Sequence, residues 1–253
     1  MPTGEAEGRR LIAAGYSDQF VQMANDCSTW LFWYRPLGRS QYELLNKGSV
    51  FFVDAGAGPF GVTAQHVIDG LLCSKRSHDH VGVQLGNVSL DPSEQLLGTD
   101  PTRDVATFRV AEGAIASLGK RPHVNPRNWP PPRPQEHRGV LFGGYRDPEC
   151  RLITPDDPLP WDFWSGFGPV TGVFDDQLTI RFNRADWVCR PGHLMPAVGA
   201  DWGGTSGGPM FAIFEGAIVD YRLGGIVKEY WPDGELLAFA PIDRIRADGT
   251  VAA

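Results

Sequence analysis

The feature that most limits how this chain can fold is a proline-rich stretch near its middle. Six of the eighteen residues at 121–138 are proline. Proline fixes φ and removes a backbone donor, so we expect an extended, semi-rigid strap rather than a folded element. A ligand for a proline-recognising module is the alternative interpretation of the same stretch. As a strap, it divides the chain into a first half at 46–120 and a second half at 139–253.

Both halves are rich in short strand-like runs. Glycine and proline turns separate runs of β-branched and aromatic residues at 49–53, 60–64, 105–110, 139–145, 178–182 and 209–214. The sequence shows no regular alternation of strands with helices, which argues against a parallel sheet. The chain is therefore predicted to be all-β, with its strands in two halves.

The segment 1–45 is predicted to hold a loose tail followed by an amphipathic helix. From Ser17 onward, apolar residues recur at steps of three and four, and Ser17 is suited to cap a helix. The apolar residues are Phe20, Met23, Ala24, Cys27 and Leu31. We expect this helix to pack on the main body, where it either docks a partner protein or only covers one face. The aromatic residues at 30–34 are interpreted as core, with a ligand surface as the alternative.

Charge and cysteine content argue against several classes of function. The net charge of −7 argues against nucleic acid or an anionic membrane as the main partner. No apolar run reaches the roughly 18 residues that cross a bilayer, and the N-terminus lacks the apolar core of a secretory signal. The four cysteines are widely spaced, which indicates neither a disulfide framework nor a zinc site. We expect free thiols, no metal site and a cytoplasmic location, and we interpret the polar run 73–80 as a solvated loop rather than as metal ligands.

One serine lies between two pairs of glycines, in the segment Gly203-Gly204-Thr205-Ser206-Gly207-Gly208-Pro209, which we call the serine loop. Glycine permits positive φ and close approach of other backbones. Such a loop can expose a hydroxyl and direct backbone N–H groups to one point, as acyl transfer to serine requires. A tight turn between strands is the alternative interpretation of the loop taken alone.

A base and an acid are available in the first half. His66 follows the run 60–64, and Asp104 directly precedes the run 105–110. Serine is a poor nucleophile near neutral pH, whereas a histidine, with an unperturbed pKa of about 6.5, can take its proton and return it to a leaving group. An aspartate can hold the imidazole in the required tautomer. His66, Asp104 and Ser206 are therefore predicted to form a catalytic triad.

The segments around these three residues resemble those of a known family. Thr63-Ala64-Gln65-His66-Val67, Asp104-Val105-Ala106 and Gly204-Thr205-Ser206-Gly207-Gly208-Pro209, in this order, are similar to the motifs of the trypsin/chymotrypsin-like serine peptidases, and most of all to their bacterial members. The resemblance implies two antiparallel β-barrels, with His66 and Asp104 in the first and Ser206 in the second. It also implies an oxyanion hole made by the N–H groups of Gly204 and Ser206, and it implies no cofactor.

The chain departs from this family at several positions. Thr205 stands where animal members carry an aspartate that pairs with a newly freed N-terminus, so we expect activity without N-terminal cleavage. No cysteine follows His66 to form the family's usual disulfide. The resemblance places substrate contacts at Ala200, Asp201, Trp202, Lys228, Glu229 and Tyr230. Lys228 replaces a residue that is commonly small, and Trp202 and Tyr230 are alternatively core aromatics.

These observations together predict a serine endopeptidase that cleaves protein or peptide substrates through an acyl-enzyme on Ser206. Two alternatives stay open: a binding module that keeps the fold without turnover, and an esterase that uses the same three residues. The endopeptidase and the esterase both need a reactive Ser206, whereas the binding module does not.

Overall fold

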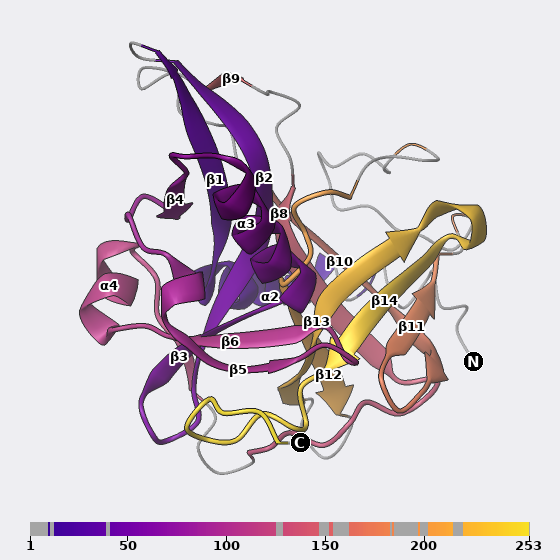
Figure 1. Ribbon diagram of the computed structural model, residues 1–253. Helices are drawn as coiled ribbons and strands as arrows, with labels where there is room; N and C mark the ends of the chain where they lie inside the picture. The colour runs from indigo at the N-terminus through magenta and orange to yellow at the C-terminus, as the bar shows by residue number, and fades with distance from the viewer. Residues whose placement is uncertain are drawn as a thin grey trace.

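The structure, a computed structural model, describes residues 10, 13–38, 41–124, 129–146, 152–153, 162–182, 184, 197, 202–214 and 220–252. Strands dominate this part of the chain and form a first sheet and a second, closed barrel (Figure 1). The first sheet, coloured indigo to magenta, lies beside the barrel, coloured mostly orange to yellow. The predicted all-β fold class is confirmed.

The first sheet follows the path β4-β1-β2-β3-β6-β5. These strands are β1 (Ser28–Gly38), β2 (Gln41–Asp54), β3 (Pro59–Thr63), β4 (Gly82–Leu85), β5 (Leu96–Asp100) and β6 (Val105–Arg109). Two further short strands pair with β2: β7 (His123–Val124) runs parallel to it and β9 (Leu152–Ile153) antiparallel. Among the described residues, no ladder joins β4 to β5 at the two ends of this path.

The first sheet begins at Ser28, which corrects the boundary predicted at residue 46. β1 pairs with β2 in a long hairpin that extends above the rest of the sheet in Figure 1. The aromatic run at 30–34 favours an extended strand because large and β-branched side chains pack well on a pleated surface. Phe32 and Trp33 are buried, so these two residues belong to the core.

The second half closes into a six-stranded barrel in the order β10-β11-β14-β13-β12-β8. Its strands are β8 (Gly139–Arg146), β10 (Asp162–Val173), β11 (Leu178–Arg181), β12 (Pro209–Phe214), β13 (Asp220–Trp231) and β14 (Leu236–Pro241). Closure leaves no free sheet edge, so every strand has two partners. Fully or almost fully buried side chains such as Phe142, Ile180, Met210 and Phe239 form its core.

Helix α2 (Tyr16–Asp26) lies near the position predicted for a helix, with different ends. Gly15, at a φ of 79°, precedes its first residue, so Ser17 lies inside the first turn and is not the cap. The helix stops before Ser28, so Leu31 belongs to β1 and not to the helix. Phe20 is buried against Phe211 of β12, with ring centroids 5.8 Å apart. The helix therefore packs on the barrel as well as on the first sheet.

Helix α3 (Gln65–Ser77) follows β3 directly and is absent from the sequence predictions. It buries Val67, Ile68 and Leu71 against the first sheet, a spacing that places them on one helical face. Its last turns include residues 73–77, so the predicted solvated loop at 73–80 is wrong for that part. The other described helices are α4 (Glu112–Ser117), η1 (Pro92–Glu94) and η2 (Pro232–Gly234). None of the described helices combines the length and hydrophobicity needed to cross a membrane.

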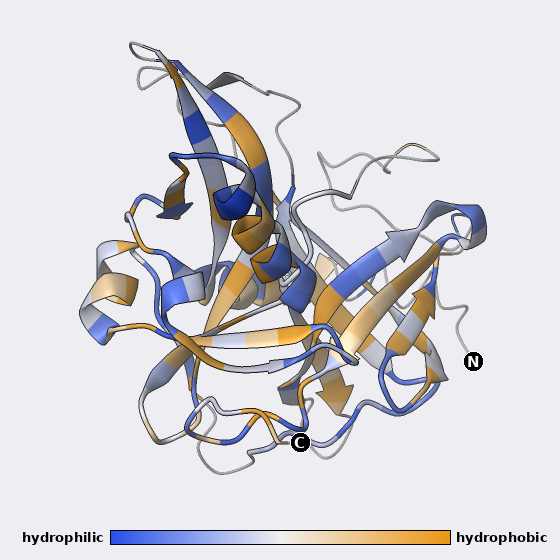
Figure 2. Ribbon diagram, in the orientation of Figure 1, coloured by the Kyte–Doolittle hydropathy of each residue, from blue (hydrophilic) through white to orange (hydrophobic). Residues whose placement is uncertain are grey.

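One hydrophobic core runs through both halves. It contains Leu31 and Phe51 of the first sheet together with Phe211 and Ile226 of the barrel. Figure 2 shows hydrophobic residues concentrated along the strands of both units and polar residues on much of helix α3. After β14, the C-terminal residues return to the first sheet, where the Thr107 hydroxyl donates to the Gly249 carbonyl oxygen at 2.6 Å. The two halves are therefore joined by shared apolar packing and by the end of the chain.

A polar cluster fastens helix α2 to the barrel. The Tyr145 hydroxyl, on β8, donates to Asn25 Oδ1 of α2 and accepts from Lys120 Nζ at 2.9 Å. Lys120 also donates to the Asn25 carbonyl oxygen at 2.7 Å. Burial raises the pKa of Tyr145, so its hydroxyl stays protonated and remains a donor.

Tyr145→Phe should therefore lower the free energy of unfolding by about 1–2 kcal/mol, because it leaves buried polar partners without the hydroxyl. Urea denaturation followed by fluorescence measures the change. Tyr34→Phe is the matched control, since the described residues offer no hydrogen-bond partner to its hydroxyl, and it should change stability by less than about 0.5 kcal/mol. Equal effects of the two substitutions would contradict the role of this cluster.

Candidate active site

His66 and Asp104 are joined by two hydrogen bonds. Asp104 Oδ1 accepts from the His66 backbone N–H at 2.8 Å, and Oδ2 lies 2.7 Å from His66 Nδ1. A carboxylate accepts hydrogen bonds, so Nδ1 carries the proton and Nε2 of a neutral ring is left as the acceptor. The Asp104 side chain is 12% exposed and that of His66 is 51% exposed. The imidazole is therefore oriented on one side and accessible on the other.

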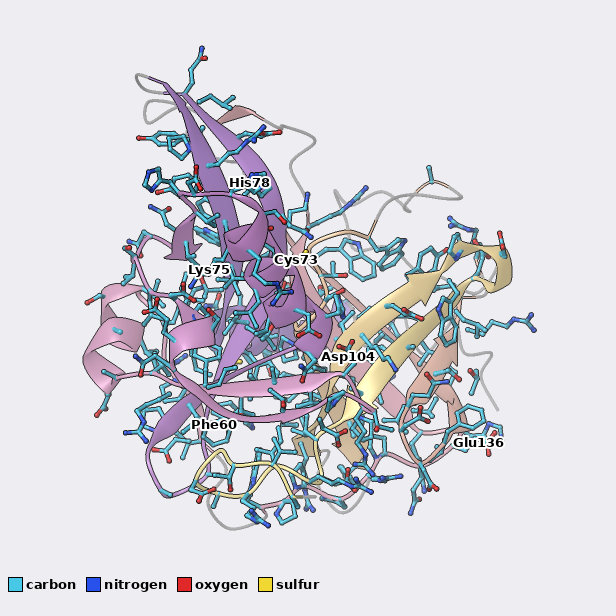
Figure 3. The ribbon with its side chains drawn as sticks, viewed as in Figure 1. Phe60, Cys73, Lys75, His78, Asp104 and Glu136 are labelled. Atoms are coloured by element: carbon cyan, nitrogen blue, oxygen red, sulfur yellow. The ribbon has the colours of Figure 1, made fainter. Side chains whose placement is uncertain are left out.

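Local structure explains how these two residues meet. His66 lies in the first turn of α3, directly after β3, and Asp104 lies in the turn before β6, which is the neighbour of β3 in the sheet. Asp104 adopts a φ of 64°, which is uncommon for a residue with a side chain. Its carbonyl oxygen accepts from the Gln65 N–H at 3.1 Å. Figure 3 shows Asp104 where the first sheet meets the barrel.

The turn that carries Asp104 is held by charges from distant parts of the chain. The Arg103 side chain is 5% exposed and donates to the Asp243 carboxylate, which follows β14. Arg133 of the strap donates to the second oxygen of Asp243 at 2.8 Å. Asp100 Oδ1 accepts from the Arg103 backbone N–H at 3.1 Å. The strap and the C-terminal segment thus both support the turn next to Asp104.

The serine loop is fixed to strand β13. The Gly207 N–H donates to the Val227 carbonyl oxygen and the Val227 N–H donates to the Gly208 carbonyl oxygen, both at 2.8 Å. The Ser206 hydroxyl donates to the Lys228 carbonyl oxygen at 3.0 Å. The pairing of β13 with β14 shifts register between Val227 and Glu229, at Lys228. Within the described residues, the structure places His66 and Ser206 on facing halves without a hydrogen bond between them.

Two backbone donors of the serine loop lack an internal partner. No hydrogen-bond acceptor for the N–H of Gly204 or of Ser206 occurs in the part of the chain that the structure describes. Gly204 has a φ of 90°, a conformation that glycine adopts without strain. Unpaired N–H groups in a partly buried loop can bind an anionic oxygen. This is the chemistry that an oxyanion hole needs.

The glycines after Ser206 are required by close backbone contacts. A Cβ on Gly207, which has a φ of 88°, would lie 2.2 Å from the Ser49 carbonyl oxygen. A Cβ on Gly208 would lie 2.0 Å from the Gly143 carbonyl oxygen. Both distances are shorter than any real contact, so the motif has a structural reason that does not depend on catalysis.

The residues predicted to contact substrate fall into two groups. Ala200 and Asp201 lie outside the described residues. Trp202 and Tyr230 have ring centroids 4.9 Å apart, and Trp202 also lies against Trp164 at 4.1 Å. These rings pack at the edge of the barrel core, and the Trp202 Nε1 atom is buried with no hydrogen-bond partner in the part of the chain that the structure describes.

Lys228 and Glu229 follow the serine loop's partner Val227 along β13. Lys228 is partly buried and Glu229 is exposed. Lys228 contributes its backbone carbonyl oxygen to the site through the contact with Ser206. Among the residues that the structure describes, no carboxylate forms an ion pair with the Lys228 side chain.

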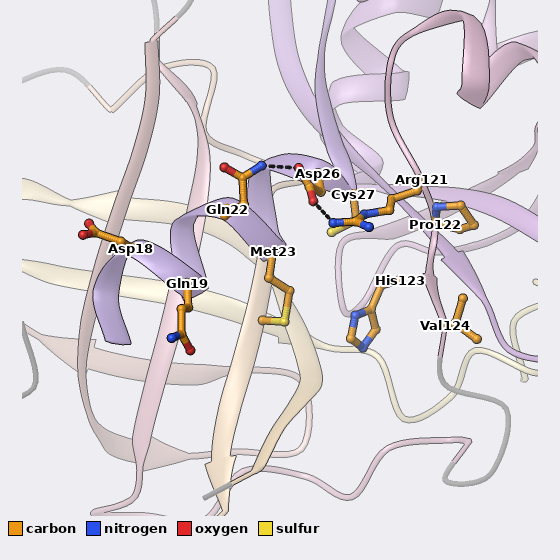
Figure 4. Close-up of a pocket in the computed structure, with 10 residues that line it drawn as sticks. All are labelled: Asp18, Gln19, Gln22, Met23, Asp26, Cys27, Arg121, Pro122, His123 and Val124. Carbon is orange, nitrogen blue, oxygen red and sulfur yellow. Dashed lines mark hydrogen bonds and ion pairs between the residues drawn. The ribbon is translucent and has the colours of Figure 1, made fainter. Parts of the chain in front are cut away.

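The Cys27 thiol is a poor nucleophile candidate. Burial raises the pKa of the Cys27 thiol to about 12, so it stays protonated. Cys27 lines a cavity of about 550 Å³ between α2 and residues 121–124 (Figure 4). Asp26 and Arg121 form an ion pair at the wall of this cavity. The cavity shares no lining residue with the site around Ser206.

The sequence predictions missed the residues that hold this site in place. Ser49 contacts the serine loop, and Arg103 and Asp243 support the turn before Asp104. Arg103 and Asp243 are far apart in sequence, and no local pattern marks them as partners. The only signal at Ser49 is a small polar residue at the start of the apolar run 49–53.

Comparisons with known proteins identify similar structures but no sequence family. Neither a family model nor a curated protein sequence matches the chain. A thermostable serine protease from an extremophilic microorganism aligns at 15% identity and a TM-score of 0.47, over 86% of this chain and 92% of that one. The tobacco vein mottling virus protease aligns at 9% identity and a TM-score of 0.46, over 87% and 79%. A Sesbania mosaic virus structure, described by the coupled folding and binding of its VPg protein, aligns at 14% identity and a TM-score of 0.43, over 86% and 87%.

Acidification should weaken the support of the Asp104 turn. Partial burial acts to raise the pKa of Asp243, but hydrogen bonds and charges from Arg133 and Arg103 outweigh burial and lower that pKa. A carboxyl with a lowered folded-state pKa stabilises the fold above its unfolded value of about 3.9, and this contribution is lost as the pH falls through the folded value. Asp243→Asn should therefore be less stable than the parent at neutral pH, and the gap should narrow below about pH 4.

Urea denaturation of both proteins across this pH range measures the gap. Asparagine keeps the shape of the side chain, so the comparison isolates the charge. A difference in unfolding free energy that stays constant from neutral to acidic pH would contradict the proposed ion-pair support.

Proposed function

We propose that the protein is a serine endopeptidase that cleaves protein or peptide substrates. The observation that carries this proposal is the Asp104–His66 pair, which leaves His66 Nε2 as an accessible base in a chain that also offers Ser206 beside two unpaired N–H groups. A histidine oriented by a carboxylate, a serine and free backbone donors are the parts that acyl transfer requires. The reaction needs no cofactor.

In the proposed reaction, the Ser206 hydroxyl exchanges the Lys228 carbonyl oxygen for His66 Nε2 as its acceptor. Ser206 Oγ then attacks the substrate carbonyl carbon while His66 takes the proton. The N–H groups of Gly204 and Ser206 stabilise the oxyanion, and loss of one such donor typically costs about 10²–10³ in rate. His66 returns the proton to the leaving amine, and water releases the acyl group by the same steps in reverse.

The proposed reaction leads to assignments of the substrate-contacting residues and of the cellular location. We assign substrate contacts to Ala200, Asp201 and Trp202, which precede the serine loop, and to Lys228, Glu229 and Tyr230, which lie on its partner strand β13. We also place the protein in the cytoplasm of a bacterium. The free thiols of Cys27 and Cys73, the described cysteines, support the cytoplasmic part of this placement.

A binding module without turnover is the second candidate, because one observation favours it. The Ser206 hydroxyl bonds to the Lys228 carbonyl oxygen and not to His66. If that contact persists with substrate present, Ser206 has no base and the fold can only bind. Reactivity of Ser206 separates the two candidates.

A fluorophosphonate probe should label the parent protein on Ser206, and Ser206→Ala should abolish labelling without changing the thermal unfolding midpoint. Ser117→Ala is the matched control, since Ser117 is exposed on α4 and its hydroxyl donates to the Gly113 carbonyl oxygen within the same helix. It should be labelled like the parent. Intact-protein mass spectrometry measures the adduct, and equal labelling of Ser206→Ala would refute the assignment.

Cleavage of a peptide library distinguishes the endopeptidase from the other candidates. The parent should cut peptides and Ser206→Ala should not. Hydrolysis of simple esters with no cut peptide would instead identify an esterase. Absence of both activities and of labelling would leave only the binding module.

A further inference from the structure

We propose that Ser49 is a positioning residue that holds the serine loop in its reactive shape from the opposite half of the molecule. Ser49 lies on β2 of the first sheet and is fully buried. The serine loop belongs to the barrel half. The proposal extends the proposed function, because it concerns the same nucleophile.

The backbone of Ser49 connects the serine loop to the strand that leads to His66. Its N–H donates to the Ser206 carbonyl oxygen at 2.8 Å. Its carbonyl oxygen accepts from the Thr63 hydroxyl at 2.7 Å, and Thr63 is the last residue of β3. Ser49 therefore bonds both to the nucleophile Ser206 and to the strand that precedes the base His66, although these two residues lie in different halves.

The side chain of Ser49 contributes a second, independent restraint. Its Oγ lies 2.7 Å from the Gly204 carbonyl oxygen and 2.8 Å from the Tyr145 backbone nitrogen. An N–H can only donate and a carbonyl oxygen can only accept, so the hydroxyl proton must point to Gly204. Because Oγ accepts a hydrogen bond from the Tyr145 N–H, the direction of the hydroxyl proton toward Gly204 is fixed by these two neighbouring groups.

This restraint acts on the peptide groups on either side of the one that carries the Ser206 N–H. Gly204, at a φ of 90°, follows another glycine, Gly203, and glycine allows a peptide group to rotate at little cost. Ser49 holds the carbonyl oxygens of Gly204 and Ser206. The two oxygens belong to the Gly204–Thr205 and Ser206–Gly207 peptide groups, which flank the Thr205–Ser206 peptide that carries the Ser206 N–H. With both flanking peptide groups fixed, the Ser206 N–H between them keeps its direction.

The space around Ser49 supports a role for the hydroxyl and not only for packing. A Cβ on Gly144 would lie 3.1 Å from Ser49 Oγ and 2.7 Å from the Thr205 carbonyl oxygen. The hydroxyl therefore occupies a narrow gap between β8 and the serine loop. Replacing Ser49 with alanine would remove the hydroxyl and leave the buried Gly204 carbonyl oxygen and Tyr145 N–H without this hydrogen-bond partner.

The test compares Ser49→Ala with Ser28→Ala. Ser28 is equally buried, lies on the adjacent strand β1 and donates to the Ala24 carbonyl oxygen, with no contact to the serine loop. Both variants should lose similar stability. Only Ser49→Ala should slow fluorophosphonate labelling of Ser206, by about 10-fold or more, and lower kcat for a cleaved peptide with little change in KM.

Hydrogen–deuterium exchange of the serine loop supplies a readout that does not depend on activity. Ser49→Ala should speed exchange at residues 203–208 relative to Ser28→Ala. Equal labelling and equal loop exchange in the two variants would overturn the role of Ser49, whatever the parent's activity. An unlabelled parent with faster loop exchange only in Ser49→Ala would reject the proposed function and retain Ser49 as the residue that holds the loop.

Discussion

The hydrogen bonds between Ser49 and the serine loop join the two halves of this protein at one point. A buried strand of the first sheet supplies an N–H to Ser206 and a hydroxyl to Gly204. Backbone contacts this close leave no room for side chains, which is why Gly207 and Gly208 follow the serine. The packing of the two halves therefore also determines the shape of the serine loop. Any change in how the sheet sits on the barrel would change the loop.

The same junction explains why elements outside the site matter to it. Tyr145 donates its backbone N–H to Ser49, and its hydroxyl anchors helix α2 through Asn25. Asp243 follows the last barrel strand and supports the turn before Asp104. The N-terminal helix and the C-terminal segment thus each reach one side of the candidate site through buried polar contacts.

The sequence was sufficient to predict the parts of the fold that depend on local pattern. Strand-like runs separated by glycine and proline predict the all-β class, and residue 139 begins β8. The boundary at 46 was wrong because β1 follows α2 with only Cys27 between them, so no turn residues mark the change. Helix α3 was missed because only three buried residues, Val67, Ile68 and Leu71, mark its inner face.

For the site, local motifs predicted which residues to examine, and the structure places His66 and Asp104 in contact. The partner of the Ser206 hydroxyl was not predictable, because it depends on the register shift of β13 at Lys228. The support from Arg103 and Asp243 was not predictable either, since it joins a turn to a segment beyond the barrel. Tertiary contacts of this kind leave no periodicity in the sequence.

The most direct test of the account is the rate at which a fluorophosphonate labels Asp104→Asn. Asparagine keeps the size of the side chain but can present an amide group to His66 Nδ1, which favours the wrong tautomer of the ring. We predict that labelling of Ser206 slows by on the order of 10³–10⁴. Asp69→Asn, an exposed change on α3, should label like the parent. Equal rates for all three proteins would contradict the claim that His66, oriented by Asp104, activates Ser206.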